Sequence, residues 1–254
     1  MTNIIMHGCN GKMGHVISRL AAADPDVRIV AGIDPNTTAA FGYPVYPTPQ
    51  DCAQAGVQAD VVIDFSIAKA VPALLAFAAQ TRIPVVVCTT GLDQAQIQLV
   101  QDTAKDTAVL FSANMSLGVN LLVNLVQKAA GVLTGAGFDI EIVEKHHNQK
   151  VDAPSGTALY IADSINQALP EHYAYAYDRS KERAKRPVKE IGIHAVRGGT
   201  IVGEHDVIFA GQDEILQISH TALSKDIFAV GAVNAAKFLN GKAAGLYNMG
   251  HVIG

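Results

Sequence analysis

The first 115 residues alternate short, unbroken apolar runs with segments of helical period. The apolar runs are NIIMHG, VRIVAGID, VVIDFS, IPVVVCTTG and AVLFSANMS. Helices are expected between them at residues 12–23, 67–80 and 93–105. Strands that are apolar on both faces are typical of a parallel sheet covered by helices. The alternation therefore predicts an α/β fold with a doubly wound parallel sheet.

One of these predicted helices has a proline near its start. Pro72 is compatible with the first turn of the 67–80 helix, where a missing N–H removes no helical hydrogen bond. Ser66 precedes this helix and is expected to cap it. We assign no catalytic role to the segment Asp64-Phe65-Ser66.

The pattern changes after residue 115. A helix is expected at 117–130, and long, mostly alternating segments follow it: FDIEIVEKHH, EIGIHAVRG, TIVGEHDVIFAG and DEILQISHTA. Alternation of this kind predicts an open sheet with two unlike faces. Residues 173–189 are charged and rich in tyrosine, have no clear period, and are expected to form a surface loop. Ser224 can cap a helix at 225–239.

Composition narrows the class of protein. The chain has 254 residues, of which 49% are apolar and 17% charged, as in a soluble globular protein of one large or two modest domains. Its net charge of −4 gives no general attraction to nucleic acid or anionic lipid. The longest apolar runs are of strand length, too short to span a bilayer, and no secretory signal is recognised. We therefore expect a cytoplasmic protein without nucleic-acid or membrane partners.

The cysteines carry little functional signal. Cys9, Cys52 and Cys88 are odd in number and show no CxxC spacing. This pattern favours neither a disulfide framework nor a metal site. We interpret them as reduced, partly buried thiols.

A glycine-rich loop, GCNGKMG at 8–14, follows the first strand and opens the first helix. Glycines at this position let the backbone approach a pyrophosphate at the positive helix end. The spacing is GxxGxxG rather than GxGxxG, so the loop alone fits either a dinucleotide site or a plain turn. Asp34, at the end of the second strand, is placed to bind the ribose hydroxyls.

The cofactor type follows from the same region. A carboxylate at Asp34 repels the 2′-phosphate of NADPH, and Pro35 follows where an arginine could have compensated. NADH is therefore mildly preferred, while Lys12 and His15 leave NADPH open. The strand ends at 89–91 and 112–115 are expected to line the nicotinamide, with ordinary turn chemistry as the alternative.

The segment EIVEKHHNQKVDAPSGTA, at 141–158, joins a predicted strand to a predicted helix. His146 and His147 are adjacent on an extended chain and should point to opposite sides, so they are expected to have different roles. A metal site is the alternative, but no third Cys or His is well spaced.

The helix that follows this segment begins at Gly156 and Thr157, whose backbone N–H groups can bind carboxylates. Capping by Ser155 is the structural alternative and is compatible with such binding. The remaining histidines, interpreted as structural or exposed and without partners, are His172, His194, His205, His220 and His251.

These motifs resemble those of one enzyme family. The chain is similar, over nearly its full length, to the 4-hydroxy-tetrahydrodipicolinate (dihydrodipicolinate) reductases of lysine and diaminopimelate biosynthesis. The similarity lies in GCNGKMG, DFS, CTTG, SANMSLGVN, EIVEKHHNQKVDAPSGTA, RGGTIVGEH and NAAKFLNGKAAGLYNMGHVIG. The histidine segment is specific to that family, whereas the glycine loop is not.

The resemblance implies a fold and an activity. Residues 1–115 with 226–254 would form a Rossmann-type dinucleotide-binding domain. Residues 116–225 would form an inserted α+β domain, with an open mixed sheet, that binds substrate and builds a homotetramer. The reaction would be the reduction of a cyclic, doubly carboxylated imine-type substrate to tetrahydrodipicolinate by NADH or NADPH, without a metal.

The resemblance also implies roles for individual residues. His146 would be the general acid/base and Lys150 a second proton donor. The substrate carboxylates would be held by His147, Lys150, Gly156 and Thr157. The dinucleotide would contact Gly8, Cys9, Asn10, Gly11, Lys12, Met13, Asp34, Cys88, Thr89, Thr90, Ser112, Ala113, Asn114 and Met115.

Two positions depart from the family pattern. Members often have glycine where this chain has Cys88, and an arginine where it has Pro35. The first departure bears little on chemistry, because backbone groups make that contact, and the second weakens the case for NADPH. Two alternative functions are another dehydrogenase of similar architecture, such as one acting on aspartate, and a non-catalytic dinucleotide-binding protein.

Overall fold

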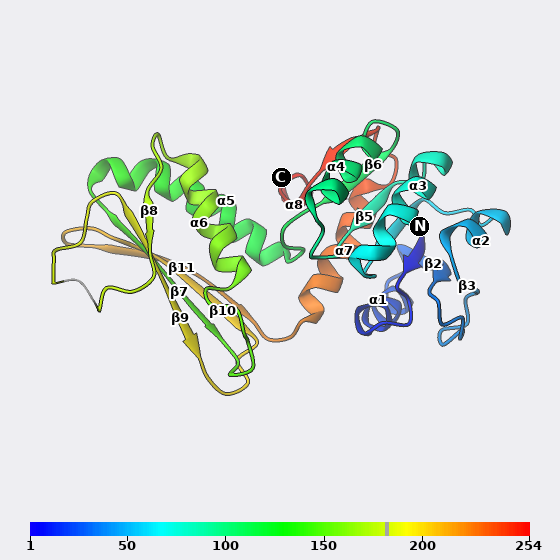
Figure 1. Ribbon diagram of the computed structural model, residues 1–254, viewed down its shortest axis with the longest axis horizontal. Helices are drawn as coiled ribbons and strands as arrows, with labels where there is room; N and C mark the ends of the chain where they lie inside the picture. Colours follow the sequence, from blue (N-terminus) through cyan, green and yellow to red (C-terminus); the bar gives the residue numbers. More distant parts are fainter. Residues whose placement is uncertain (181–182) are drawn as a thin grey trace. The chain divides into compact units, whose positions relative to one another are not determined.

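The computed structural model describes residues 1–180 and 183–254 (Figure 1). The chain forms two compact units. The N-terminal unit comprises Met1–Ser116 and Asp226–Gly254, and the central unit comprises Leu117–Lys225.

The N-terminal unit is built on a parallel seven-stranded sheet, in the order β12-β6-β5-β4-β1-β2-β3. Its strands are β1 (Thr2–His7), β2 (Val27–Ile33), β3 (Val45–Tyr46), β4 (Val61–Asp64), β5 (Val85–Val87), β6 (Ala108–Phe111) and β12 (Gly245–Tyr247). Its helices are α1 (Lys12–Ala23), α2 (Pro49–Gln54), α3 (Val71–Thr81), α4 (Gln94–Thr103), α7 (Asp226–Leu239) and α8 (Met249–Ile253), with a 3₁₀ turn η1 (Ala68–Ala70). The predicted doubly wound α/β fold is confirmed.

Helices cover both faces of this sheet. Helices α2, α3 and α4 pack together on one face, and α1 and α7 pack together on the other (Figure 1). Ile5 and Val62 lie in a buried cluster with Leu74 of α3, while their strand neighbours Ile4 and Ile63 are equally buried. Because successive strand residues point to opposite faces, burial of both explains why these strands read as unbroken apolar runs.

Two helix starts were predicted with different success. Asp93 caps α4 and forms a reciprocal capping box with Gln96, so the predicted start is confirmed. The prediction for Ser66 is wrong, because Ile67 is the N-cap of η1 and its side chain makes no cap hydrogen bond. The Ser66 hydroxyl instead donates to Asp64 Oδ1 at 2.6 Å. Pro72 lies in the first turn of α3, as predicted.

The central unit is built on a mixed five-stranded sheet, in the order β11-β10-β7-β9-β8. Strand β10 pairs antiparallel with β7 and β11, and β9 pairs parallel with β7 and β8. The elements are α5 (Leu117–Leu133), η2 (Thr134–Ala136), β7 (Asp139–His146), α6 (Gly156–Ala168), β8 (Ala174–Ala176), β9 (Glu190–Arg197), β10 (Gly203–Ala210) and β11 (Ile215–Ala222).

One face of this sheet is covered by α5 and α6, which we call the covered face (Figure 1). Ile140 and Ile142 of β7 lie on it, in a buried cluster with Ile161 of α6. The opposite face, which we call the open face, carries no helix among the described residues of this unit. The predicted open mixed sheet with unlike faces is confirmed.

Helix α5 corrects one expectation. Together with η2 it spans Leu117–Ala136 and is long and apolar enough to cross a membrane by length and composition. The sequence pattern had indicated only strand-length apolar runs. Leu122 and Val126 are nevertheless buried against α6 and the sheet, so one side of the helix forms the core of the central unit.

The expected surface loop at 173–189 includes a short strand. It contains β8, which pairs with β9, so the prediction of a loop is wrong for Ala174–Ala176. Residues 181–182, which belong to the same prediction, lie outside the described residues.

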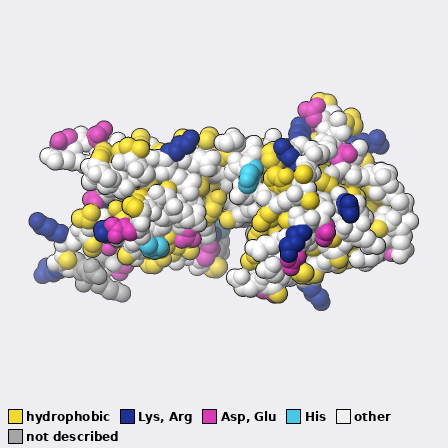
Figure 2. Space-filling model, turned by 90° about the horizontal axis from the view of Figure 1, so that it is seen from above, with side chains coloured by type: hydrophobic (Ala, Val, Ile, Leu, Met, Phe, Trp, Pro, Cys, Tyr) yellow, Lys and Arg dark blue, Asp and Glu magenta, His cyan; other side chains and the backbone are white. Residues whose placement is uncertain are grey.

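The cysteines are reduced thiols, as predicted, and the surface charges are of both signs. Cys9, Cys52 and Cys88 are free and buried. Burial raises the pKa of the Cys9 and Cys52 thiols to about 11, which keeps both protonated at neutral pH. On the face shown in Figure 2, basic and acidic side chains are interspersed and do not form a single basic patch.

Candidate functional site

The glycine loop of the N-terminal unit folds so tightly that side chains would not fit. Gly8 has φ of +79°, and a Cβ added there would lie 2.6 Å from the carbonyl oxygen of Phe65. A Cβ at Gly14 would lie 2.4 Å from the carbonyl oxygens of both Gly8 and Cys9. The loop therefore brings bare backbone to the start of α1, as a pyrophosphate site requires.

The N-terminus of α1 suits an anion. Its N-cap is Gly11, which has no side chain to satisfy the first N–H groups. The first turn contains no acidic residue. Its orphan N–H groups and the positive end of the helix dipole together favour binding of a phosphate.

Asp34 lies beside this loop, directly after β2. Its Oδ2 accepts a hydrogen bond from the Asn10 N–H at 3.1 Å, and its Oδ1 accepts one from the Asn36 N–H at 2.9 Å. The Asn10 side chain donates to the backbone oxygens of Asn36 and Thr38. The sheet thus brings the predicted ribose-binding carboxylate and the predicted phosphate loop together.

The other residues predicted to contact the dinucleotide lie at the same edge of the sheet. Cys88, Thr89 and Thr90 follow β5, and residues 112–115 follow β6. Because β5 and β6 are paired and parallel to β1, these loops and the glycine loop all lie at the carboxyl ends of strands. Ligands of open α/β sheets bind at that edge. The residues present fit a dinucleotide.

The histidine segment begins at the end of β7 in the central unit. His146 is buried on the covered face, and its Nδ1 lies 2.5 Å from Glu144 Oε2. Its ring packs edge-on against His205, with 5.2 Å between ring centroids. His147 follows the strand and is half-buried.

Lys150 lies in the loop that joins β7 to α6. Its Nζ is 2.8 Å from Asp152 Oδ1, and its side chain is 21% exposed. The hydrogen bond from Lys150 lowers the pKa of the Asp152 carboxyl, and the backbone N–H of Gly156 contributes in the same direction. Two groups predicted to hold a substrate carboxylate therefore hold a carboxylate of the chain itself.

Helix α6 begins at Gly156 and Thr157, as predicted. Ser155 is its N-cap and accepts a hydrogen bond from the Ala158 N–H at 3.1 Å. The predicted capping role of Ser155 is confirmed. The same hydroxyl lies 3.0 Å from Nε2 of His205.

Two residues of this cluster, Glu144 and Arg197, were not predicted from the sequence. Glu144 is completely buried, and the guanidinium of Arg197 binds both of its oxygens at 2.7 Å. The position of Glu144, two residues before His146 on a strand, is a usable signal, because residues i and i+2 share a face. Arg197 comes from β9 and has no such local signal.

The interpretation of the remaining histidines as lacking partners is wrong for His172, His194, His205 and His251. His205 is buried beside His146 and Ser155, and burial lowers its pKa to about 4. His194 lies 2.8 Å from Glu141 Oε2 on the open face. His172 contacts Asn166, and His251 belongs to the capping box of α8.

A metal site is the alternative use of the same segment. Among the described residues, no group of three His, Cys, Asp or Glu side chains is arranged to hold a metal ion. The groups of the histidine cluster are suited to proton transfer and to anion binding.

Comparison with known families is decisive. Residues 2–115 match the family model described as dihydrodipicolinate reductase, N-terminus, and residues 118–253 match that described as dihydrodipicolinate reductase, C-terminus. The chain belongs to the dihydrodipicolinate reductase family. It is thus an NAD(P)H-dependent oxidoreductase of lysine biosynthesis with 4-hydroxy-tetrahydrodipicolinate reductase activity.

Relatives of known function agree with the family assignment. A 4-hydroxy-tetrahydrodipicolinate reductase of Caldanaerobacter subterraneus subsp. tengcongensis is 55% identical over 249 residues, which cover 98% of this chain and 97% of the relative. A 4-hydroxy-tetrahydrodipicolinate reductase of Clostridium tetani is 45% identical over 249 residues, which cover 98% of this chain and 96% of the relative. These relatives favour the family's reaction over both alternative functions.

Solved structures share the fold. A dipicolinate-bound dihydrodipicolinate reductase from Paenisporosarcina sp. TG-14 has a TM-score of 0.81 at 24% identity, covering 98% of this chain and 97% of that one. An amine dehydrogenase from Mycobacterium smegmatis has a TM-score of 0.62 at 13% identity, covering 98% and 95%. At these identities the likeness concerns the fold alone.

Proposed function

We propose that this member of the dihydrodipicolinate reductase family performs its reduction with His146 as general acid/base and Lys150 as second proton donor. The observation that carries the proposal is the carboxylate of Asp152, bound by Lys150 and by the Gly156 N–H. A substrate carboxylate would meet the same cation and the same helix-end donor. His147 and Thr157 complete the proposed set of carboxylate ligands.

The dinucleotide would be held by the N-terminal unit, residues 1–115 with 226–254 in our assignment. The pyrophosphate would contact the loop from Gly8 to Met13, and the ribose would contact Asp34. The strand ends Cys88–Thr90 and Ser112–Met115 would line the nicotinamide. When bound, the dinucleotide supplies a hydride.

The residues of the central unit would supply the rest of the chemistry. Reduction of a conjugated imine leaves an electron-rich carbon that must receive a proton. His146 is proposed to donate that proton, with Lys150 as the second donor. Residues 147–157 would hold the dianionic substrate through cations and helix-end N–H groups, so that the carbon faces the acid.

Cofactor choice is proposed to favour NADH mildly. The Asp34 carboxylate is anchored beside the glycine loop by Asn10 and Asn36, where a 2′-phosphate would meet its negative charge. Asp34→Ala should therefore improve kcat/KM with NADPH relative to NADH. An unchanged ratio would reject this role for Asp34.

Assembly is proposed to use the open face of the 116–225 domain, to give a homotetramer. Exposed apolar side chains lie on that face, including Val196 of β9 and Ile215 of β11. Sedimentation velocity on the wild type and on Ile215→Lys tests this: the wild type should sediment as a tetramer and the variant as a smaller species. The compartment proposed for the enzyme is the cytoplasm, with no nucleic-acid or membrane partner.

The proposed site is tested by turnover of His146→Ala and Lys150→Ala. Each should lower kcat by about 10²–10⁴-fold, the usual range for general acid–base groups, while the Kd for NADH stays unchanged. Matched controls are His172→Ala and Lys105→Ala, which alter partly or fully exposed residues outside the site. Wild-type turnover in both site variants would discard the assignment.

A further inference from the structure

The buried carboxylate of Glu144 has partners at both of its oxygens. Its Oε1 accepts hydrogen bonds from the Ser155 N–H at 3.0 Å and from Arg197 Nη2 at 2.7 Å. Its Oε2 accepts one from Arg197 Nη1 at 2.7 Å and lies 2.5 Å from His146 Nδ1. Since a carboxylate offers about four acceptor sites, this set leaves none to spare.

The charge state of Glu144 follows from these partners. Burial raises the pKa of its carboxyl, but the hydrogen bonds from Arg197 and His146 outweigh burial and lower the pKa overall. Glu144 is therefore ionised at neutral pH, and an ionised carboxylate can only accept hydrogen bonds. The proton shared with His146 consequently resides on Nδ1 of the imidazole.

The other ring nitrogen of His146 faces a position without a side chain. A Cβ added at Gly203 would lie 3.0 Å from Nε2 and 3.3 Å from Cδ2 of His146. Gly203 is the first residue of β10, and its φ is not positive, so the backbone there does not itself demand glycine. The missing side chain keeps the space beside Nε2 open.

Several charged and titratable groups surround this ring. Glu144 lies on the same strand, Arg197 on β9, and Lys150 in the loop after β7. His205 packs against the ring from β10, with His220 opposite it on β11, and burial holds the pKa of both below the ordinary value. The carboxylate of Glu144 is thus the one negative charge in hydrogen-bond contact with His146 among the described residues.

We propose that Glu144 is a positioning residue for His146, which fixes the imidazole with Nδ1–H bonded and leaves Nε2 as the atom that transfers the proton. This inference rests on the proposed role of His146. In the forward reaction the Nε2–H bond of the imidazolium breaks, and its proton forms a C–H bond with the electron pair of the electron-rich substrate carbon. His146 is left neutral, still donating Nδ1–H to Glu144, and takes a new proton from water. A buried carboxylate that orients a catalytic histidine in this way is an established device in other enzymes.

Arg197 also connects Glu144 to the loop that carries Lys150. Its Nη2 also donates to the backbone oxygen of Asp152 at 2.6 Å. Asp152 in turn holds Lys150. One guanidinium therefore both neutralises Glu144 and fixes the loop that carries the second proposed proton donor.

The first test replaces Glu144 with the isosteric amide. Glu144→Gln should lower kcat by about 100-fold, with KM changed far less and NADH binding intact. Loss of the negative charge beside the ring should also change the pH profile of kcat. Glu141→Gln, on the same strand but the open face, is the matched control and should change neither kcat nor the profile.

The second test is read from the wild-type protein and does not depend on the folding of Glu144→Gln. In wild-type protein labelled with ¹⁵N-histidine, the His146 signals are assigned by their absence from His146→Gln. Neutral His146 should carry its proton on Nδ1, with Nε2 giving the shift of an unprotonated nitrogen. A neutral ring protonated on Nε2 would overturn the inference, whatever happens to the stability of Glu144→Gln.

A double variant separates this inference from the role of His146. If His146→Ala retains full turnover, the proposed site fails, and the positioning role fails with it. If His146→Ala is impaired while Glu144→Gln keeps the wild-type kcat and pH profile, only the positioning role fails. If both roles hold, Glu144→Gln should add no further loss of kcat to the His146→Ala enzyme, because it acts through the missing ring.

Discussion

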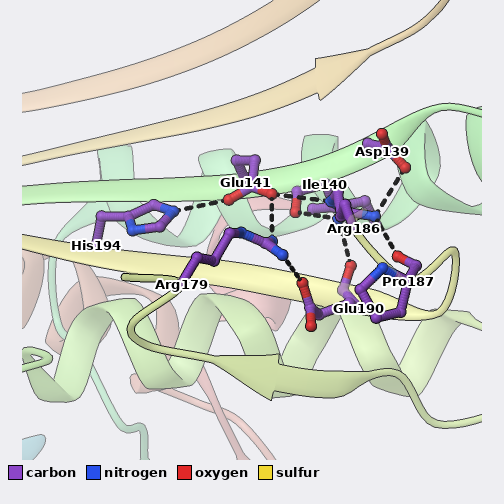
Figure 3. A network of polar contacts seen from close by, with 8 residues as sticks. All are labelled: Asp139, Ile140, Glu141, Arg179, Arg186, Pro187, Glu190 and His194. Carbon is purple, nitrogen blue, oxygen red and sulfur yellow. Dashed lines mark hydrogen bonds and ion pairs between the residues drawn. The ribbon is translucent and has the colours of Figure 1, made fainter. Parts of the chain in front are cut away.

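Two glutamates of β7, Glu141 and Glu144, point to opposite faces of the same sheet and bind similar partners. On the open face, Glu141 binds Arg179, Arg186 and His194 (Figure 3). On the covered face, Glu144 binds Arg197 and His146. Each carboxylate thus combines arginine with one histidine, but the surroundings and the attached segments differ.

Burial is the first difference. The side chain of Glu141 is 22% exposed, whereas that of Glu144 is fully buried. An ion pair in contact with water contributes little to stability, while removal of one partner of a buried pair leaves an unpaired buried charge. Removal of an arginine should therefore lower the free energy of unfolding more on the covered face than on the open face.

The second difference lies in what the partners hold. Arg186 also donates to the backbone oxygens of Ile140 and Glu190 and to Asp139, so the open-face network fastens the segment between β8 and β9 onto the sheet (Figure 3). Arg197 and Glu144 fasten the ring and loop of the proposed catalytic groups. If the proposed role of His146 holds, the same combination of carboxylate, arginine and histidine serves structure on the open face and chemistry on the covered face.

The largest expected contrast comes from removing one arginine on each face. Arg197→Met leaves the buried Glu144 carboxylate without its cation and should lower the free energy of unfolding by about 3 kcal/mol. It should also lower kcat by about 100-fold. Arg186→Met should cost about 1 kcal/mol and leave kcat unchanged, because Glu141 keeps Arg179 and His194. Urea unfolding at one fixed protein concentration measures both. Equal losses in the two variants would remove the distinction between the faces.

The pH dependence of stability gives a second, smaller contrast. His205, on the covered face, has a pKa of about 4 because it is buried. The ordinary pKa of histidine is about 6.5. Between pH 6.5 and pH 4, His205 therefore binds a proton in the unfolded chain but not in the folded chain. The free energy of unfolding should therefore fall by about 2 kcal/mol from pH 6.5 to pH 5. His205→Gln should remove most of this fall, and an undiminished slope in the variant would contradict the assignment.

Measurement above pH 5 separates the contribution of His205 to the free energy of unfolding from that of Glu144. The lowered pKa of Glu144 stabilises the fold above the ordinary carboxyl value of about 4.5. That contribution is lost only as the pH falls below this value toward the lower native pKa. Unfolding measured between pH 6.5 and pH 5 thus reports on buried histidine, with His220 contributing in the same direction.

A third test concerns the space beside Nε2 of His146. Gly203→Ala would place a methyl group 3.0 Å from that nitrogen. Turnover should fall about tenfold as the ring shifts, with little change in melting temperature. Gly198→Ala is the matched control, because a Cβ there would meet nothing within 4 Å. A wild-type rate in Gly203→Ala would show that the space is not used.

Most of the N-terminal fold could be predicted because its strands are buried on both faces and stand out as apolar runs. The strands that were missed in this unit are short: β3 has two residues, and β12 has three. Such segments carry no periodic signal, and neighbouring strands impose their conformation. Strand β8 was missed for the same reason, within a polar segment.

The candidate site could be predicted only where its residues are close in sequence. His146, Lys150 and Gly156 lie within one motif, and Glu144 has the strand spacing that places it beside His146. Arg197, 53 residues from Glu144, reaches it through the register of β7 and β9. His205 reaches the cluster through β10. These contacts depend on strand pairing, which no local pattern specifies.

The smallest expected effect tests the open-face network through a glycine. A Cβ at Gly192 of β9 would lie 1.7 Å from Oε2 of Glu141, so Gly192→Ala must push that carboxylate off its present position. The ion pairs with Arg186 and His194 should then weaken, at a cost of about 1 kcal/mol in the free energy of unfolding. Gly131→Ala, on the exposed side of α5 with nothing within 4 Å of the added Cβ, should instead be neutral or stabilising. The kcat of Gly192→Ala should equal that of the wild type, because Glu144 and His146 lie on the other face of the sheet. A fall in kcat as large as that expected of Arg197→Met would mean that the two faces are coupled.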